Sequence, residues 1–124
     1  MQQTWKKMLA AGVKLGYGSG ATPVSNGQGR IFSKECNCSH GVQSEMFPIF
    51  VSWGATPVYT LRMATLVNAE IVRQEGKLGE LVPGAHADLL VVDGDPYRDI
   101  SVLLGDGQNM PAIMLGGRFV KNTL

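Results

Sequence analysis

The amino-acid sequence predicts an α/β chain, with helices in its first part and short strands in its second. Apolar residues recur at helical spacing up to about Gly76. An unbroken apolar run then occupies residues 89–92, and the pair Gly116-Gly117 separates two short segments near the end of the chain. A short apolar run bounded by turn residues is typical of a buried strand, and paired glycines suit the tight primed turn of a hairpin. Helices are therefore expected to give way to strands near Gly76.

The chain opens with a predicted helix followed by a predicted strand. Trp5, Met8 and Leu9 lie at helical spacing, and residues 13–17 alternate as in a short strand. Residues 16–39 are rich in Gly, Ser, Asn and Pro and lack periodicity. This composition predicts a long loop directly after the strand.

Two further helices are predicted before the boundary. The first covers residues 42–53, with apolar residues on one face, and Gly54 would end it. Thr56 is a preferred N-cap residue and Pro57 suits the first helical position, so a third helix is expected to start there and to end before Gly76.

The remainder of the chain is predicted to form strands and turns. We expect strands over residues 78–82 and 87–92, and the continuous apolar character of the second predicts burial on both faces. Residues 112–115 and 118–120 would form the final hairpin. Asp99 is well placed to cap a short helical turn between these strands.

Composition and charge exclude several classes of partner. The chain has 124 residues, 44% of them hydrophobic and 17% charged, as in soluble globular proteins. A net charge of +1 without a Lys/Arg cluster gives no site for nucleic acid or an anionic membrane, and no apolar run reaches the ~20 residues that span a bilayer. Cys36 and Cys38 are too close for an unstrained disulfide. We therefore expect a cytoplasmic protein.

Three segments resemble the amidohydrolase superfamily of metal-dependent hydrolases, particularly its imidazolonepropionase and Xaa-Pro dipeptidase-like branches. Residues 54–72, GATPVYTLRMATLVNAEIV, are similar to the helices after the last barrel strand. Residues 77–96, KLGELVPGAHADLLVVDGDP, are similar to the closing β-layer, and residues 11–20, AGVKLGYGSG, to the last barrel strand. A (β/α)8 barrel needs about 250 residues, so a whole barrel cannot be present.

The resemblance implies two domains and a function. Residues 1–76 would be the last strand and helices of an amidohydrolase-like (β/α)8 barrel, and residues 77–124 part of the small β-sandwich beside it. The family hydrolyses C–N bonds of small cyclic amides or dipeptide-like substrates with one or two divalent metals, commonly zinc, which lower the pKa of a bound water.

The catalytic residues of the family are expected to be absent from this chain. The family carries an aspartate at the end of the last strand, usually in a G-T-D motif, which ligates the metal and accepts the proton of the water. Gly18-Ser19-Gly20 matches this motif, so Gly20 takes the place of the aspartate and has no ligand atom. The histidine ligands of the family come from strands that would precede Met1. We therefore expect no catalytic residue and no cofactor here, and a small-molecule substrate only in the full-length family.

Two interpretations of this absence compete: a C-terminal remnant of a longer enzyme, or a self-standing paralogue that lost catalysis. We favour the remnant, because the sequence starts within what resembles a barrel, and open strand edges would promote self-association. Aspartate at Gly20 alone should not restore activity. The alternative function is a non-catalytic interaction module that pairs with a partner or with itself through exposed barrel edges.

Two further sets of residues are candidates for a site. His40, Gln43 and Glu45 resemble a stretch that shapes the rim of the substrate pocket in the family, although His40 also suits an exposed loop or helix start. Cys36, Cys38 and His40 could ligate zinc, but structural zinc sites favour two to four residues between cysteines. We favour free thiols in a loop and expect no metal there.

Overall fold

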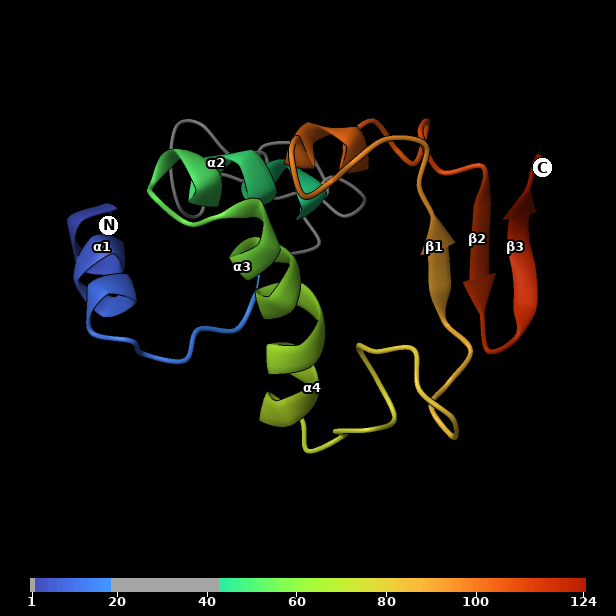
Figure 1. The fold of residues 1–124 in the computed structure, drawn as a ribbon, viewed down its shortest axis with the longest axis horizontal. Helices are drawn as coiled ribbons and strands as arrows, with labels where there is room; N and C mark the ends of the chain where they lie inside the picture. Colours follow the sequence, from blue (N-terminus) through green and yellow to red (C-terminus); the bar gives the residue numbers. More distant parts are fainter. Residues whose placement is uncertain (1, 19–42) are drawn as a thin grey trace, which may run out of the picture.

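The computed structural model describes residues 2–18 and 43–124 as a group of helices beside a small antiparallel sheet (Figure 1). The helices occupy the first part of the chain and the sheet the last part, as the sequence predicts. In chain order the elements are α1 Gln2–Ala10, the 3-10 turn η1 Gln43–Glu45, α2 Met46–Ser52, α3 Pro57–Arg62, the π-turn η2 Met63–Val67, α4 Asn68–Ile71, β1 Leu89–Val91, the 3-10 turn η3 Ile100–Leu103, β2 Ala112–Leu115 and β3 Arg118–Asn122.

The first predicted helix is confirmed, but the predicted strand at residues 13–17 is wrong. Helix α1 ends at Ala10, and the segment after it runs alongside α3 and α4 without forming a strand (Figure 1). The backbone N–H of Tyr17 donates to the carbonyl of Met63, 3.2 Å away. A strand requires a neighbouring strand, and within the described residues this segment has a helix as its neighbour instead.

Aromatic side chains from α1 and α2 build the main core. Trp5 stacks on Phe50 with ring centroids 4.6 Å apart, and Trp53 meets Phe50 edge-on at 6.1 Å. Met46 and Met63 complete the buried cluster. The predicted helix over residues 42–53 is confirmed as η1 followed by α2. Its apolar face therefore packs as the spacing predicts.

The third predicted helix is confirmed, although it is not uniform. Thr56 caps α3 by accepting the N–H of Tyr59 at 3.1 Å, and Pro57 is the first helical residue. The hydroxyl of the fully buried Thr60 donates to the Thr56 carbonyl at 3.0 Å. A π-turn, η2, then separates α3 from α4. Such turns displace backbone carbonyls from the regular helical pattern, so that they can reach other partners.

The sheet has the order β1-β2-β3, with both pairs antiparallel. Gly116 and Gly117 link β2 to β3 with φ angles of 55° and 80°, which confirms the predicted primed hairpin turn. The Asp88 carboxylate accepts the N–H of Gly116 at 2.6 Å and supports this turn. The strand predicted over residues 87–92 is confirmed with the shorter bounds of β1.

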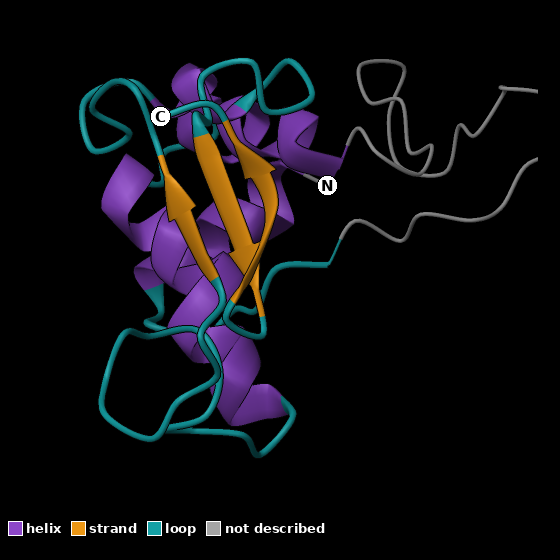
Figure 2. Ribbon diagram, turned by 90° about the vertical axis from the view of Figure 1, so that its right-hand side faces the viewer, coloured by secondary structure: helices purple, strands orange, loops and turns teal. Residues whose placement is uncertain are grey.

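Two predictions about the second part are wrong. Residues 78–82 form bends and irregular backbone instead of a strand, because Gly79 has a φ of 78° and lies directly against the backbone of Thr65. Strand β1 is not buried on both faces: Leu90 is 53% and Val91 37% exposed. Figure 2 shows helices behind one face of the sheet and no described element over the other. The described residues therefore leave part of this apolar run uncovered.

Asp99 caps η3 as predicted. Its carboxylate accepts the backbone N–H of Ser101 at 2.9 Å. Hydrogen bonding to the side chain of Ser101, and then to its backbone, holds the pKa of Asp99 below its ordinary value.

Across the ranges 2–18 and 43–124, no helix is both long and apolar enough to cross a bilayer.

Candidate functional site

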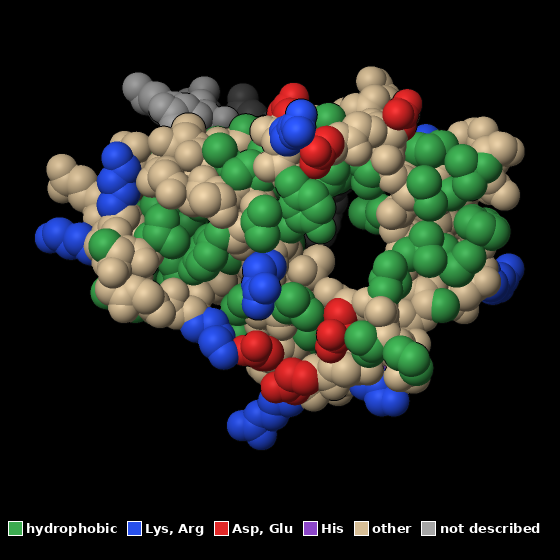
Figure 3. Space-filling view, viewed as in Figure 1, with side chains coloured by type: hydrophobic (Ala, Val, Ile, Leu, Met, Phe, Trp, Pro, Cys, Tyr) green, Lys and Arg blue, Asp and Glu red, His purple; other side chains and the backbone are tan. Residues whose placement is uncertain are grey.

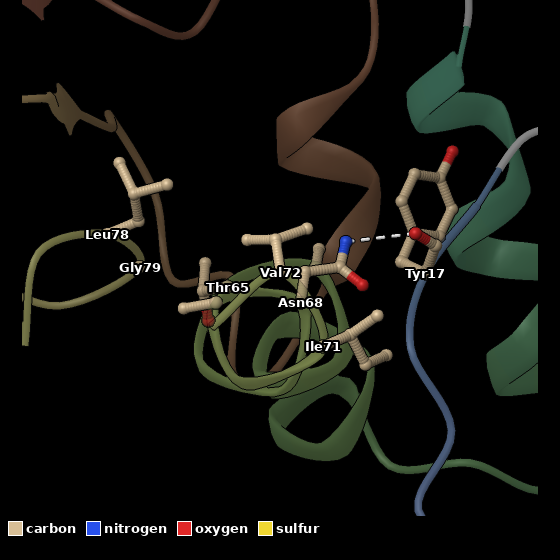
Figure 4. Close-up of a pocket in the computed structure, with 9 residues that line it drawn as sticks. Tyr17, Thr65, Asn68, Ile71, Val72, Leu78 and Gly79 are labelled. Atoms are coloured by element: carbon tan, nitrogen blue, oxygen red, sulfur yellow. Dashed lines mark hydrogen bonds between the residues drawn. The ribbon is translucent and has the colours of Figure 1, made fainter. Parts of the chain in front are cut away.

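Tyr17 joins three segments that are distant in sequence. Its N–H donates to the Met63 carbonyl at 3.2 Å, and its own carbonyl accepts the side-chain amide of Asn68 at 2.9 Å (Figure 4). Its phenol donates to the Gln43 carbonyl. We call these four residues the Tyr17 junction. It holds the end of the segment that resembles a last barrel strand against η1, η2 and α4.

Two local features allow this close approach. A Cβ on Gly16 would lie 2.3 Å from the Ile71 Cδ1 and 2.7 Å from the Asn68 Oδ1, so only glycine fits without displacing these side chains. Met63 is the first residue of the π-turn, where the carbonyl pattern of the helix changes. A close-packed glycine and a local change in helix geometry therefore position the junction.

A groove of about 410 Å³ lies beside the junction (Figure 4). We call it the α4 groove, and its lining is mainly apolar with no charged side chain among the described residues. Nine residues line it: Tyr17, Ala64, Thr65, Asn68, Ala69, Ile71, Val72, Leu78 and Gly79. Ile71 and Val72 are 59% and 56% exposed. The groove thus presents apolar surface to solvent.

A second cavity of about 330 Å³ lies between η1, η3 and the sheet. Phe47, Leu90, Leu103 and Ile113 give it apolar walls, and Asp106 is also in the lining. Figure 3 shows a hollow between the helical part and the sheet, with hydrophobic side chains on both sides of it. The molecule is therefore open between its two parts.

Of the three predicted rim residues, the structure describes Gln43 and Glu45, which lie at the two ends of η1. Gln43 is half-buried, lines the second cavity and contributes its backbone carbonyl to the Tyr17 junction. Glu45 is exposed at the end of η1 and lies outside the lining of both cavities. His40 lies outside the described residues. A common rim of these three residues therefore stays a prediction.

The described residues do not fit the divalent metal that the sequence resemblance implies. Nowhere in residues 2–18 and 43–124 do three His, Cys, Asp or Glu side chains gather as a metal site would require. Thr60 is the buried polar side chain of this part, and His86 is exposed. Gly20 and the proposed zinc ligands Cys36 and Cys38 lie outside the described residues.

Sequence reasoning missed the Tyr17 junction. Asn68 falls within the third predicted helix, although Asn is a poor helix former within an otherwise good helical sequence. A poor helix former inside a helix is one signal, and a glycine directly before an aromatic residue, Gly16 before Tyr17, is another. Together they could have indicated that the Asn68 side chain bonds to the backbone of a neighbouring segment. The pairing with Met63 leaves no such signal, because it uses backbone groups only.

The amidohydrolase family model matches residues 2–120. The chain belongs to the amidohydrolase family. A crystal structure of an amidohydrolase is 35% identical, has a TM-score of 0.79, and is matched over 99% of this chain and 26% of its own. A prolidase complexed with N-methylphosphonate-L-proline is 33% identical, with a TM-score of 0.75, over 98% of this chain and 26% of its own.

One curated relative is an adenine deaminase of Rubrobacter xylanophilus (strain DSM 9941 / JCM 11954 / NBRC 16129 / PRD-1). It is 34% identical over 71 residues, which are 56% of this chain and 11% of the deaminase. The chain therefore spans about a quarter of the solved amidohydrolases it matches and a smaller part of the deaminase. The resemblance to the family and to its Xaa-Pro dipeptidase-like branch is confirmed.

Proposed function

We propose that this chain is the C-terminal part of a metal-dependent amidohydrolase that hydrolyses a C–N bond, and that the isolated chain is inactive. The observation that carries the proposal is the family match over residues 2–120 together with a described region whose side chains do not fit the family's metal. When bound, such a metal supplies an activated water. The ligands would have to come from another part of a complete enzyme.

We assign the substrate class as dipeptide-like, with a small cyclic amide as the second class. The prolidase with a bound proline phosphonate is similar over 98% of this chain, which supports the first class. The adenine deaminase is similar over 56% of this chain, and its name supports C–N bond hydrolysis in general, so the cyclic-amide class rests on the resemblance of the sequence alone. Both names describe reactions at C–N bonds.

The role of this chain is to support the site structurally. In our proposal residues 1–76 are the last strand and helices of the barrel, and residues 77–124 are part of the adjoining β-sandwich. The Tyr17 junction holds residues 13–18 against the helices. Gly20 has no proton acceptor, so in our proposal the chain supplies supporting structure without a catalytic group.

A chimera tests the proposal. The last quarter of the prolidase is replaced by this chain, either unchanged or with Gly20→Asp, and hydrolysis of an Xaa-Pro dipeptide is measured with added zinc or manganese. The same Gly20→Asp change in the isolated chain is the control. We expect activity only in the chimera with Gly20→Asp, because only that protein combines the aspartate with the remaining ligands.

Two outcomes would contradict the proposal. Hydrolysis by the isolated chain, unchanged or with Gly20→Asp, would show a complete site within it. A folded chimera that binds metal but stays inactive with Gly20→Asp would show that this segment cannot replace the corresponding part of a prolidase. Circular dichroism and elemental analysis distinguish that result from simple misfolding.

A further inference from the structure

We infer that the hydroxyl of Tyr17 is a positioning group for the substrate rim. It holds η1, which carries the rim candidates Gln43 and Glu45, against residues 13–18. The inference rests on the proposed function and adds a residue that acts through others without touching the substrate itself. Tyr17 and Gln43 are 26 positions apart in the sequence, yet the phenol donates to the backbone carbonyl of Gln43.

Tyr17 is attached to four elements at once. Its backbone N–H donates to the Met63 carbonyl at 3.2 Å on η2, and its carbonyl accepts the amide of Asn68 at 2.9 Å on α4. Its ring packs against the ring of Phe47 on α2, with centroids 5.1 Å apart. Its phenol donates to the Gln43 carbonyl on η1. Because η2 and α4 hold the backbone of Tyr17, its hydroxyl has a defined position from which to hold η1.

The turn η1 depends on such contacts because it is short. It consists of the three residues Gln43–Glu45, and a single 3-10 turn has few hydrogen bonds of its own and poor bond geometry. Glu45 occupies the N-cap position of α2, but its side chain makes no cap hydrogen bond. Capping therefore does not orient η1 relative to α2, and contacts with distant residues must help to determine where η1 lies.

The hydroxyl, and not the ring, carries the inference. The ring packs on the aromatic core, where phenylalanine would fill the same space. The hydroxyl adds a donor to a backbone carbonyl, so this bond does not use the side chain of Gln43. Gln43 lines the second cavity, and Glu45 is exposed. The phenol thus holds the backbone of η1 and leaves both rim side chains available to a ligand.

Tyr17→Phe tests the inference, because it removes the hydroxyl and keeps the ring. Tyr59→Phe is the matched control: Tyr59 is also half-buried, packs on the same core, and donates through its hydroxyl to the Val13 carbonyl at 3.4 Å. Both variants are made in the chimera that carries Gly20→Asp. We would measure kcat and KM for an Xaa-Pro dipeptide and the affinity for N-methylphosphonate-L-proline, the compound bound to the similar prolidase.

We expect Tyr17→Phe to raise KM by about three- to tenfold and to weaken phosphonate binding by a similar factor, which is the range that one hydrogen bond allows. Because the rim acts on substrate binding, kcat should stay within about twofold. Tyr59→Phe should change neither constant. Partial unfolding would instead reduce the amount of active enzyme, which lowers the apparent kcat at constant KM.

A second measurement asks whether the hydroxyl acts through η1. In a chimera that also carries Gln43→Ala and Glu45→Ala, both rim side chains are removed. Tyr17→Phe should then have little further effect on phosphonate affinity, because no rim side chain is left to position. An unchanged effect of Tyr17→Phe in this background would overturn the inference.

The remaining outcomes separate the inference from the proposed function. A fall in kcat at constant KM, or equal effects of Tyr17→Phe and Tyr59→Phe, would overturn the inference and leave the proposed function intact. If the chimera with both tyrosines binds the phosphonate but is inactive, the proposed function fails, and the phosphonate affinities alone decide the inference. A folded chimera that binds no phosphonate would overturn both.

Discussion

Asn68 is the residue at which local preference and tertiary need conflict most clearly. Asn lowers helix stability relative to Ala or Leu, yet it is the first residue of α4. Its side-chain amide donates to the Tyr17 carbonyl at 2.9 Å. The helix therefore tolerates a weak helix former because its side chain satisfies a backbone acceptor on a neighbouring segment.

Replacing Asn68 by leucine should destabilise the chain. The Tyr17 carbonyl would lose the hydrogen bond from Asn68 in a partly buried position, which costs about 1–3 kcal/mol. Urea unfolding at matched protein concentration measures the loss. Asn109→Leu is the control, because Asn109 makes a similar amide bond to the Val102 carbonyl at an exposed site. Equal losses in the two variants would show that burial of the Tyr17 junction adds nothing.

Gly79 gives a second prediction at this scale. It has a φ of 78°, and a Cβ there would lie 2.6 Å from the Thr65 carbonyl carbon and oxygen. Gly84→Ala is a matched control, since its φ is 89° and no atom lies within 4 Å of the added Cβ. Both variants should lose about 1–2 kcal/mol from the left-handed backbone. The added methyl group of Gly79→Ala should lower the free energy of unfolding by about 1–3 kcal/mol more, because it overpacks the contact with Thr65.

The same unfolding measurement decides between the two glycines. If Gly79→Ala is no less stable than Gly84→Ala, the turn at residues 76–80 does not pack on η2 in solution. Rigid backbone atoms make the clash at Gly79, so side-chain rotation cannot relieve it.

Asp99 gives a prediction about pH. Because its folded pKa is lowered, its contribution to stability is present above its unfolded pKa and is lost as pH falls through the folded pKa. The stability difference between wild type and Asp99→Ala should therefore be full at neutral pH and close in acid. An NMR titration of the Asp99 carboxyl with a midpoint at or above its ordinary value would contradict this.

At the scale of elements, local signals predicted some structure well. Thr56 and Pro57 start α3 where the sequence places it, and Gly116 and Gly117 form the expected turn. These features depend on residues within one turn of each other. The sequence alone therefore suffices for caps and tight turns.

Elements that depend on distant partners were predicted less well. Residues 13–17 have a strand-like pattern, but a helix is their described neighbour. Residues 78–82 look apolar enough for a strand, but Gly79 packs on Thr65 instead. Pairing partners and long-range packing are not encoded in local periodicity, so neither outcome could be read from the segment itself.

The candidate site follows the same division. The sequence indicated Gln43, but as a side chain on a substrate rim, whereas its carbonyl bonds to Tyr17. It gave no indication of the carbonyl of Met63 as a partner. Backbone groups have no residue identity, so only the fold shows which of them meet.

At the scale of the whole molecule, the open apolar surfaces predict self-association when no partner is present. Large apolar side chains on α4 and the sheet are more than half exposed, among them Ile71, Leu90 and Phe119. Light scattering of the purified chain over a range of concentrations should show oligomers that grow with concentration. Val72→Lys should reduce this association more than Val58→Lys does. A compact monomer that is stable at all concentrations would contradict the prediction.

The metal content of the purified, tag-free chain tests the central claim most directly. The claim is that this chain supports an amidohydrolase fold without holding the catalytic metal itself, since no described group of side chains fits one. Elemental analysis after dialysis against zinc should therefore find far less than one metal ion per chain. One zinc per chain, lost in a Cys36→Ser and Cys38→Ser variant or retained by an oligomer, would contradict the claim and show that the chain builds a metal site of its own.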